Sequence, residues 1–477
     1  MKINEEKRLK ELLKDALIEG LLLISVKANA DPVSQQAPCL PKKHQFPELK
    51  EFSSGLPRFS FHESETIDYA EIYKKNSEKE LLIHANQYRE FVLECDFLQQ
   101  YFSFGKYIEE PFLNYPQFHE TLKDIFSYGF IGEFCDTYVY TFGMDFSDND
   151  FDYMFNLYFS GISSTKLDII VCVPILLVKF ESDKIILDSN VSIERMSNGL
   201  QLARNEQMSL TGTVNKSVIG AATHALMIRG WVVPNRNKSE RSKVLFELSA
   251  YKKIQGLVDI AFSALRVAIP NLETGYGQII AVEDGWRTVF HANLPEVVVL
   301  SERNYPQHFE NFGWLNETLP VCSDHDDDIR NSFIHLFNSP QLQLVVNRLN
   351  KASLYNRDDD SIIDIAIALE SILTSDSKSE INYRLSARAA LLCKKVPFKK
   401  YSVKEIVALC KRIYDFRSSI VHGEFAKQQK KRLITVEENK IIVINELALE
   451  FLKHIIWALS LQPEIKKAAD IDDLLFG

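Results

Sequence analysis

The spacing of apolar residues changes character along this chain of 477 residues. In the middle of the chain, β-branched runs bounded by Gly, Asn and Asp predict strands. A helix is expected between them, around residues 254–265, where apolar residues repeat at helical spacing. Residues 31 to about 160 combine Phe, Tyr and acids with proline-rich loops, and there the pattern determines little. The predicted strands cover residues 167–180, 184–193, 225–233, 278–282 and 296–301.

After the acidic loop at 324–328, helical patterns follow one another, apart from a short strand-like stretch near 432–443. The segment 362–373 is apolar on nearly every side, so it should be the buried centre of an up-and-down bundle, with Ser361 as its N-cap. The expected helices are 328–338, 341–355, 361–373, 380–393, 403–421 and 444–459.

The fold class expected is therefore α+β: a mixed N-terminal region, residues 1–320, followed by a C-terminal all-α bundle, residues 321–477. The first region is either one unit or two units divided near residue 160. The length of this region suits a sensing or regulatory role, in which it controls the smaller C-terminal unit.

The N-terminal segment, the longest apolar run and the cysteines indicate where in the cell the protein is expected. The apolar stretch 17–26 resembles a signal peptide, but Glu19 interrupts it and acids precede it, so an amphipathic helix is predicted. The longest apolar run, 169–178, contains Pro174 and is strand-sized, so no membrane partner is expected. Seven scattered cysteines without C-x-x-C spacing indicate neither disulfides nor a zinc site. We expect a cytoplasmic protein without metal or cofactor.

Charge is distributed unevenly. A formal net charge of -10 excludes a generally basic nucleic-acid coat and leaves only a local basic site. From residue 394 to 432 there are twelve Lys and Arg against three Asp and Glu, an excess that can hold a phosphate backbone. Lys411, Arg412 and Lys427 are the candidate contacts.

Arg417 and His422 lie within this basic stretch. Arg417 is expected to interrupt an apolar seam, so it needs either a carboxylate partner or a cleft or interface where an anion binds. His422 comes five residues later, about 140° around a regular helix. Gly423 should end the helix and free the imidazole from that direction. The expected seam comprises Val403, Ile406, Val407, Cys410, Ile413, Tyr414, Ile420 and Val421.

The same Arg-to-His spacing occurs twice elsewhere, so spacing alone is a weak signal. Arg303 and His308 span a proline in an expected loop. Arg330 and His335 are expected on the solvated flanks of an amphipathic helix. Only the Arg417 pair combines a seam position, a following glycine and a basic setting.

Three segments together resemble the Apea-like branch of the HEPN superfamily: Asp364 to Glu370, Tyr383 to Leu385 with Arg388, and Tyr414 to Gly423. The resemblance covers roughly residues 325–465. It implies that Arg417 and His422 are the active-site pair of a metal-independent ribonuclease that often works across a homodimer, and that the protein is a toxin or defence effector. Ser418 departs from the Asn, Asp or His that active members often carry after the arginine.

RNA supplies its own nucleophile, the 2′-hydroxyl, so cleavage needs a base, an acid and a cation near the phosphate. An imidazole and a guanidinium suit these tasks, and two copies in a dimer would provide two imidazoles. The alternative is an inactive module that binds RNA or a nucleotide; a scaffold without nucleic acid is a third. The remaining charged residues, Asp364, Glu370, Arg384 and Arg388, form either a buried ionic lattice or an accessory catalytic group.

Overall fold

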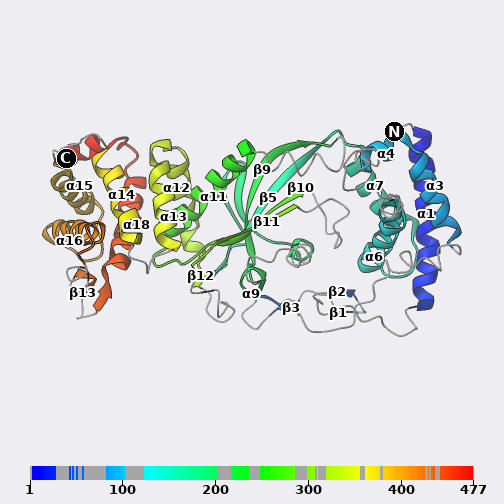
Figure 1. Ribbon diagram of the computed structural model, residues 1–477, viewed down its shortest axis with the longest axis horizontal. Coiled ribbons are helices and arrows are strands. Elements are labelled where there is room, and N and C mark those ends of the chain that lie inside the picture. The colour runs from blue at the N-terminus through cyan, green and yellow to red at the C-terminus, as the bar shows by residue number, and fades with distance from the viewer. Residues whose placement is uncertain are drawn as a thin grey trace.

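In the computed structural model, a helical N-terminal part, an antiparallel sheet and a C-terminal group of helices follow one another along the long axis of the molecule (Figure 1). The protein is thus α+β, as expected. The structure describes residues 3–27, 42–43, 46–47, 50–51, 56–58, 82–102, 123–201, 204, 216–235, 248–284, 298–306, 309, 319–354, 360–375, 380–424, 428, 431–435 and 441–475.

The N-terminal helices surround an aromatic core. α1 packs against α3 and α6, and the ring centroids of Phe130 and Tyr158 lie 4.6 Å apart. This core draws on residues from Leu9 to Ile162. The cores that involve the sheet are made of residues from Leu167 onward, together with Leu56. The helices are α1 (Ile3–Lys27), α3 (Ile83–Glu94), α4 (Asp96–Phe102), a π-helical turn (Ile125–Gly129), α6 (Phe130–Phe142) and α7 (Asp148–Ser163).

The sheet has six strands in the order β11-β10-β5-β9-β8-β7, and every neighbouring pair is antiparallel. Its long central strands, β5 and β9, are mostly buried. The strands are β5 (Lys166–Pro174), β7 (Lys184–Asp188), β8 (Val191–Arg195), β9 (His224–Pro234), β10 (Tyr276–Glu283) and β11 (Val298–Asn304). Two short strands, β6 (Val178–Phe180) and β12 (Leu319–Val321), form a separate parallel pair.

Two of the predicted strands are each divided into two strands in the structure. Residues 184–193 form a hairpin of β7 and β8, because the turn at Ser189 and Asn190 divides them. Residues 167–180 divide into β5 and β6, and Leu177 between them has a positive φ of 70°. The other strand predictions are confirmed within a few residues.

Two helices join the sheet to the other C-terminal helices, and one of them, residues 326–337, also packs directly against β7. α11 (Leu248–Ala268) lies between the strands and α12 (Asp326–Phe337) and α13 (Gln343–Leu354), and also contacts α18 (Ile444–Ser460) (Figure 1). A single apolar core runs from Val171 and Ile228 of the sheet, through Val258 of α11, to Leu447 of α18. The sheet and the bundle therefore share one core.

The C-terminal bundle is built around α14 (Asp360–Thr374), which contacts α13, α15 (Ile381–Lys395), α16 (Val403–Val421) and α18. Its expected central position is confirmed by the burial of Ile362, Ile365, Leu369 and Leu373. Ser361, however, is no N-cap, because α14 already includes Asp360. Ser361 is buried, and its hydroxyl accepts a hydrogen bond from Asn445 Nδ2 at 2.8 Å.

Two small elements complete the C-terminal part. The strand-like stretch predicted near 432–443 is the hairpin of β13 (Leu433–Thr435) and β14 (Ile441–Val443). A 3-10 segment, Ala468–Leu475, packs on α14 and α15. No helix in the described ranges is long and apolar enough to cross a lipid bilayer.

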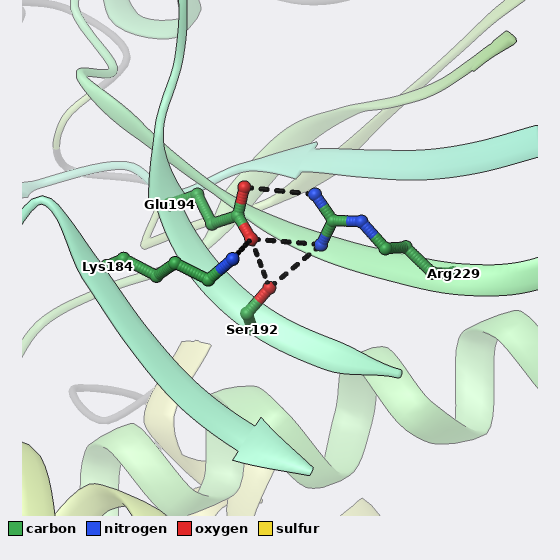
Figure 2. Close-up of polar contacts among 4 residues, drawn as sticks. All are labelled: Lys184, Ser192, Glu194 and Arg229. Carbon is green, nitrogen blue, oxygen red and sulfur yellow. Dashed lines mark hydrogen bonds and ion pairs between the residues drawn. The ribbon is translucent and has the colours of Figure 1, made fainter. Parts of the chain in front are cut away.

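A charged cluster joins three strands at one end of the sheet (Figure 2). The carboxylate of Glu194 on β8 accepts hydrogen bonds from Arg229 Nη1 and Nη2 at 2.9 and 3.0 Å. It also accepts a hydrogen bond from the Ser192 hydroxyl at 2.7 Å and forms an ion pair with Lys184 Nζ at 2.9 Å. Burial alone would raise the pKa of Glu194, but these donors outweigh it and lower the pKa to about 2. The cluster thereby fixes β7, β8 and β9 to one another.

Replacing Glu194 with Gln should lower the free energy of unfolding by about 1 kcal/mol at pH 7, a modest value because solvent partly screens the cluster. The folded-state pKa lies below the ordinary value of 4.5, so this stability is present above pH 4.5 and is lost as the pH falls toward 2. Urea denaturation at pH 7 and pH 3 measures the difference. Asp188→Asn is the control, because Asp188 is an exposed residue of β7, and it should change the free energy of unfolding little. An equal loss in this variant would contradict the assignment.

Candidate functional site

Arg417 lies at the border of the buried face of α16. The expected seam is partly wrong, since Val403 and Val421 are exposed. Leu409 and Phe416 continue the buried face instead, because they follow the other inward positions at helical spacing. Arg417, next to Phe416, is half-buried. The buried residues of α16 are Ile406, Leu409, Cys410, Ile413, Phe416 and Ser419.

The Arg417 guanidinium has no carboxylate partner among the residues that the structure describes. Its Nε is buried and has no hydrogen-bond acceptor. Its Cζ lies 5.6 Å from the ring centroid of Tyr414, one turn earlier on α16. A cation on an aromatic face retains some stabilisation but leaves its donors unused. Of the two alternatives for Arg417, the structure thus favours an open anion site over an internal ion pair.

Glu370 of α14 also acts on Tyr414. The pKa of Tyr414 is raised by burial, and further by the charge and hydrogen bonding of Glu370, whereas the Arg417 charge lowers it. The Glu370 Oε1 atom is buried without a hydrogen-bond partner. Glu370, Tyr414 and Arg417 therefore form one small polar group between α14 and α16. Sequence reasoning placed Tyr414 in the apolar seam and missed this role, although its spacing of three residues from Arg417 was the available signal.

His422 is the C-terminal cap of α16, and its imidazole is exposed. The expectation that the helix ends here is confirmed, since the positive φ of 67° falls on Gly423. His422 itself has a φ of −91° and a ψ of 1°, which depart from the values of a regular α-helix. The direction of its imidazole relative to Arg417 stays a prediction.

Asp364 and Arg388 serve elsewhere in the bundle. Asp364 pairs with Arg348 of α13. Arg388 is 1% exposed, and its Nε and Nη2 donate to the two carboxylate oxygens of Asp472 at 2.9 and 2.7 Å. Its Nη1 donates to the Leu373 carbonyl at 2.8 Å. The expected lattice is thus two separate ion pairs with other acids and bases, and this geometry gives Arg388 a structural role.

The basic residues predicted to contact a phosphate backbone have different surroundings. Lys411 is exposed, whereas Arg412 Nη2 donates to the Leu433 carbonyl at 2.6 Å and so ties α16 to β13. Lys427 lies outside the described residues. Ser418 and Arg384 are both half-buried, and the Ser418 carbonyl accepts the His422 amide at 3.0 Å.

The other two Arg and His pairs differ from the expectation in part. Arg303 belongs to strand β11 rather than to a loop, and His308 lies outside the described residues. Arg330 is near the surface and donates from Nε to the Ile186 carbonyl at 2.8 Å. His335 is not on a solvated face: it lines a cavity between α12 and α14, its Nε2 is buried without a partner, and burial lowers its pKa.

Comparison with protein-family models, with curated proteins and with solved structures gives no match.

If Arg388 holds the bundle together, Arg388→Met should lower the free energy of unfolding by about 3 kcal/mol, because it leaves the Leu373 carbonyl and Asp472 without their donor. Asp472→Asn should cost less, since Asp472 is half-exposed. Chemical denaturation of both variants, with Lys394→Met at an exposed position of α15 as the control, tests this. A stable Arg388→Met protein would return Arg388 to the list of catalytic candidates.

Proposed function

We propose that the C-terminal bundle is a metal-independent endoribonuclease of the HEPN type, with Arg417 and His422 as its catalytic pair. The observation that carries the proposal is the Arg417 guanidinium, whose Nε is buried and lacks an acceptor. Burying an unpaired cation, even partly, costs free energy unless an anion binds to it. The basic stretch from residue 394 to 432 makes a phosphate the fitting anion.

In this proposal the 2′-hydroxyl of RNA attacks the neighbouring phosphorus, and the bond to the 5′-oxygen breaks. Arg417 donates hydrogen bonds to the phosphate oxygens as charge accumulates on them. His422 transfers a proton, which suits an imidazole near neutral pH. The products carry 2′,3′-cyclic phosphate and 5′-hydroxyl ends.

A second copy of the chain completes the proposed site. The reaction needs both a base and an acid, and one copy offers a single imidazole for the two tasks. A homodimer supplies an imidazole from each copy, one as base and one as acid, around a two-fold axis.

Exposed apolar residues suggest where that dimer forms. α15 and α16 contact each other and are joined by a short connection, so they run antiparallel. The start of α15 therefore lies beside the end of α16. Tyr383, which is 75% exposed, and Val421, which is 53% exposed, both lie at this end, near Arg417 and His422. An exposed aromatic and an exposed aliphatic residue suit a subunit interface.

The N-terminal helices and the sheet would then sense a signal or restrain the bundle, in a cytoplasmic toxin or defence effector. The second candidate function, an inactive module that binds RNA or a nucleotide, is favoured by the exposed and unpaired state of His422 in the single chain.

Purified protein incubated with RNA in EDTA should cleave it, and Arg417→Ala and His422→Ala should each reduce the rate by at least about 100-fold, the usual range for loss of an acid, a base or a charge-stabilising group. Gel electrophoresis measures the rate, and mass spectrometry identifies the 2′,3′-cyclic phosphate ends.

Arg330→Ala and His335→Ala, which have the same spacing, are the matched controls and should retain activity. RNA binding without cleavage by the wild-type protein would favour the inactive module instead. Loss of cleavage in His335→Ala, with activity retained in His422→Ala, would move the site to α12.

Val421→Glu should dissociate the dimer and reduce cleavage in parallel, because it places a charge in the proposed apolar interface. Val403→Glu is the matched control: Val403 lies on the same helix, is 49% exposed and is at the opposite end of the helix. Analytical ultracentrifugation gives the oligomeric state and the cleavage assay gives the rate. A fully active monomer would refute a shared site.

A further inference from the structure

A cavity of about 380 Å³ lies where the sheet side of the molecule meets the bundle, well within the size range of small-molecule sites. The C-terminal end of α11, the start of α12, the turn before α16 and one face of α18 enclose it. The lining residues used below are Arg266, Asp328, Phe398, Glu450, Lys453, His454 and Trp457.

Lys453 of α18 is the residue that most requires an explanation. It is 8% exposed, yet its ammonium has no hydrogen bond and no ion pair within the described part of the chain. Burial lowers its pKa to about 8, and the charge of Arg266 lowers it as well, against opposing effects of Glu450 and Glu273. The nearest carboxylate on α18, Glu450, is already paired with Lys399. Lys453 therefore lacks a direct anionic partner within the described part of the chain, although these two carboxylates act on it from a distance.

Arg266 brings a second buried cation to the same cavity. Its Nη2 donates to the Thr274 carbonyl at 2.7 Å and its Nη1 donates to Asn350, but its Nε is buried and has no acceptor. These two like charges repel each other and are costly to desolvate. The carboxylates of Asp328 and Glu450 also line the cavity, but neither is bonded to Lys453 or Arg266 in the described part of the chain. An anion between them would compensate both charges.

Part of the cavity lining is aromatic, and two of its rings belong to α18, the helix that carries Lys453. The ring centroid of His454 lies 5.1 Å from that of Phe398 and 5.6 Å from that of Trp457. His454 Nε2 lies 2.9 Å from the Val396 carbonyl oxygen, which fixes the imidazole in place. Neighbouring rings are tilted to each other by 50° and 51°, so a flat ligand can stack on one ring and contact the next at an angle.

We propose that this cavity binds a small organic anion, a planar ring that carries one phosphate or carboxylate, with the anionic group at Lys453 and Arg266 and the ring against His454 and Trp457. This site is separate from Arg417, and the proposal does not depend on ribonuclease activity. The ligand would contact two helices at once: α11, which packs against the sheet, and α18, which belongs to the bundle.

Isothermal titration of the full-length protein with benzoate, phenyl phosphate, adenosine 5′-monophosphate and inorganic phosphate tests the proposal. At least one ring-bearing anion should bind at least about tenfold more tightly than inorganic phosphate, because stacking adds to the charge interaction. Benzoate against phenyl phosphate distinguishes a carboxylate from a phosphate, and adenosine monophosphate tests a larger ring. No binding at millimolar concentration, or equal affinity for inorganic phosphate, would overturn the proposal.

Lys453→Met keeps the length of the side chain and removes its charge. It should weaken binding by at least about tenfold and also raise Tm, because an unpaired buried charge is lost. Lys252→Met, at an exposed position of α11, is the control and should change neither quantity. Unchanged affinity in Lys453→Met would sink the assignment.

A measurement on the wild-type protein guards against a variant that fails to fold. Lys453 should react with an amine-acylating reagent at pH 8.5, as quantified by peptide mass spectrometry, and the ring-bearing anion should protect it. Protection confined to other lysines would contradict the site.

Discussion

The rest of the structure depends on α11, whose side chains are buried on both of its sides. Val258 and its neighbours pack toward the strands, and the same apolar core continues through α12 and α13 to Leu447 of α18. Beside this shared core, Asn350 of α13 accepts hydrogen bonds from Ser263 and Arg266 of α11, so polar contacts also hold the two helices together. Burial of apolar area is the dominant favourable term in folding, so the two parts stabilise each other and cannot move as independent bodies without exposing α11.

Buried cations differ in whether their hydrogen-bond donors are used within the chain, and this difference separates structural from functional positions. Arg204 is fully buried, and its guanidinium donates to the carbonyls of Ile219, Gly220 and Ala222. Arg388 has the carboxylate of Asp472. These side chains use their donors within the chain. Arg417 and Lys453 do not, and in a folded protein such positions are retained at a cost, which is the physical reason for assigning ligands to them.

The sequence was informative where a pattern repeats and uninformative where contacts are distant. Helix periodicity located α14 and α16 closely, and Gly423 marked the end of α16 correctly. The pairing of Arg388 with Asp472 joins residues 84 positions apart, which no local pattern encodes. Lys453 follows Leu452 in an apolar stripe and gave no signal, because its environment is made by α11 and the turn at Phe398. Arg417 was recognisable as unusual, but its border position depended on Leu409 and Phe416.

The shared core also sets an order of events during synthesis. α11 leaves the ribosome long before α18, since Leu248 and Ile444, where the two helices start, are 196 positions apart. Until residues 326–460 have been made, the side of α11 that faces α12, α13 and α18 has no partner and remains an apolar surface exposed to water. The sheet can therefore form early but cannot reach its final stability alone, and the nascent chain needs protection from aggregation during that interval. Completion of the bundle is thus the step that closes the fold.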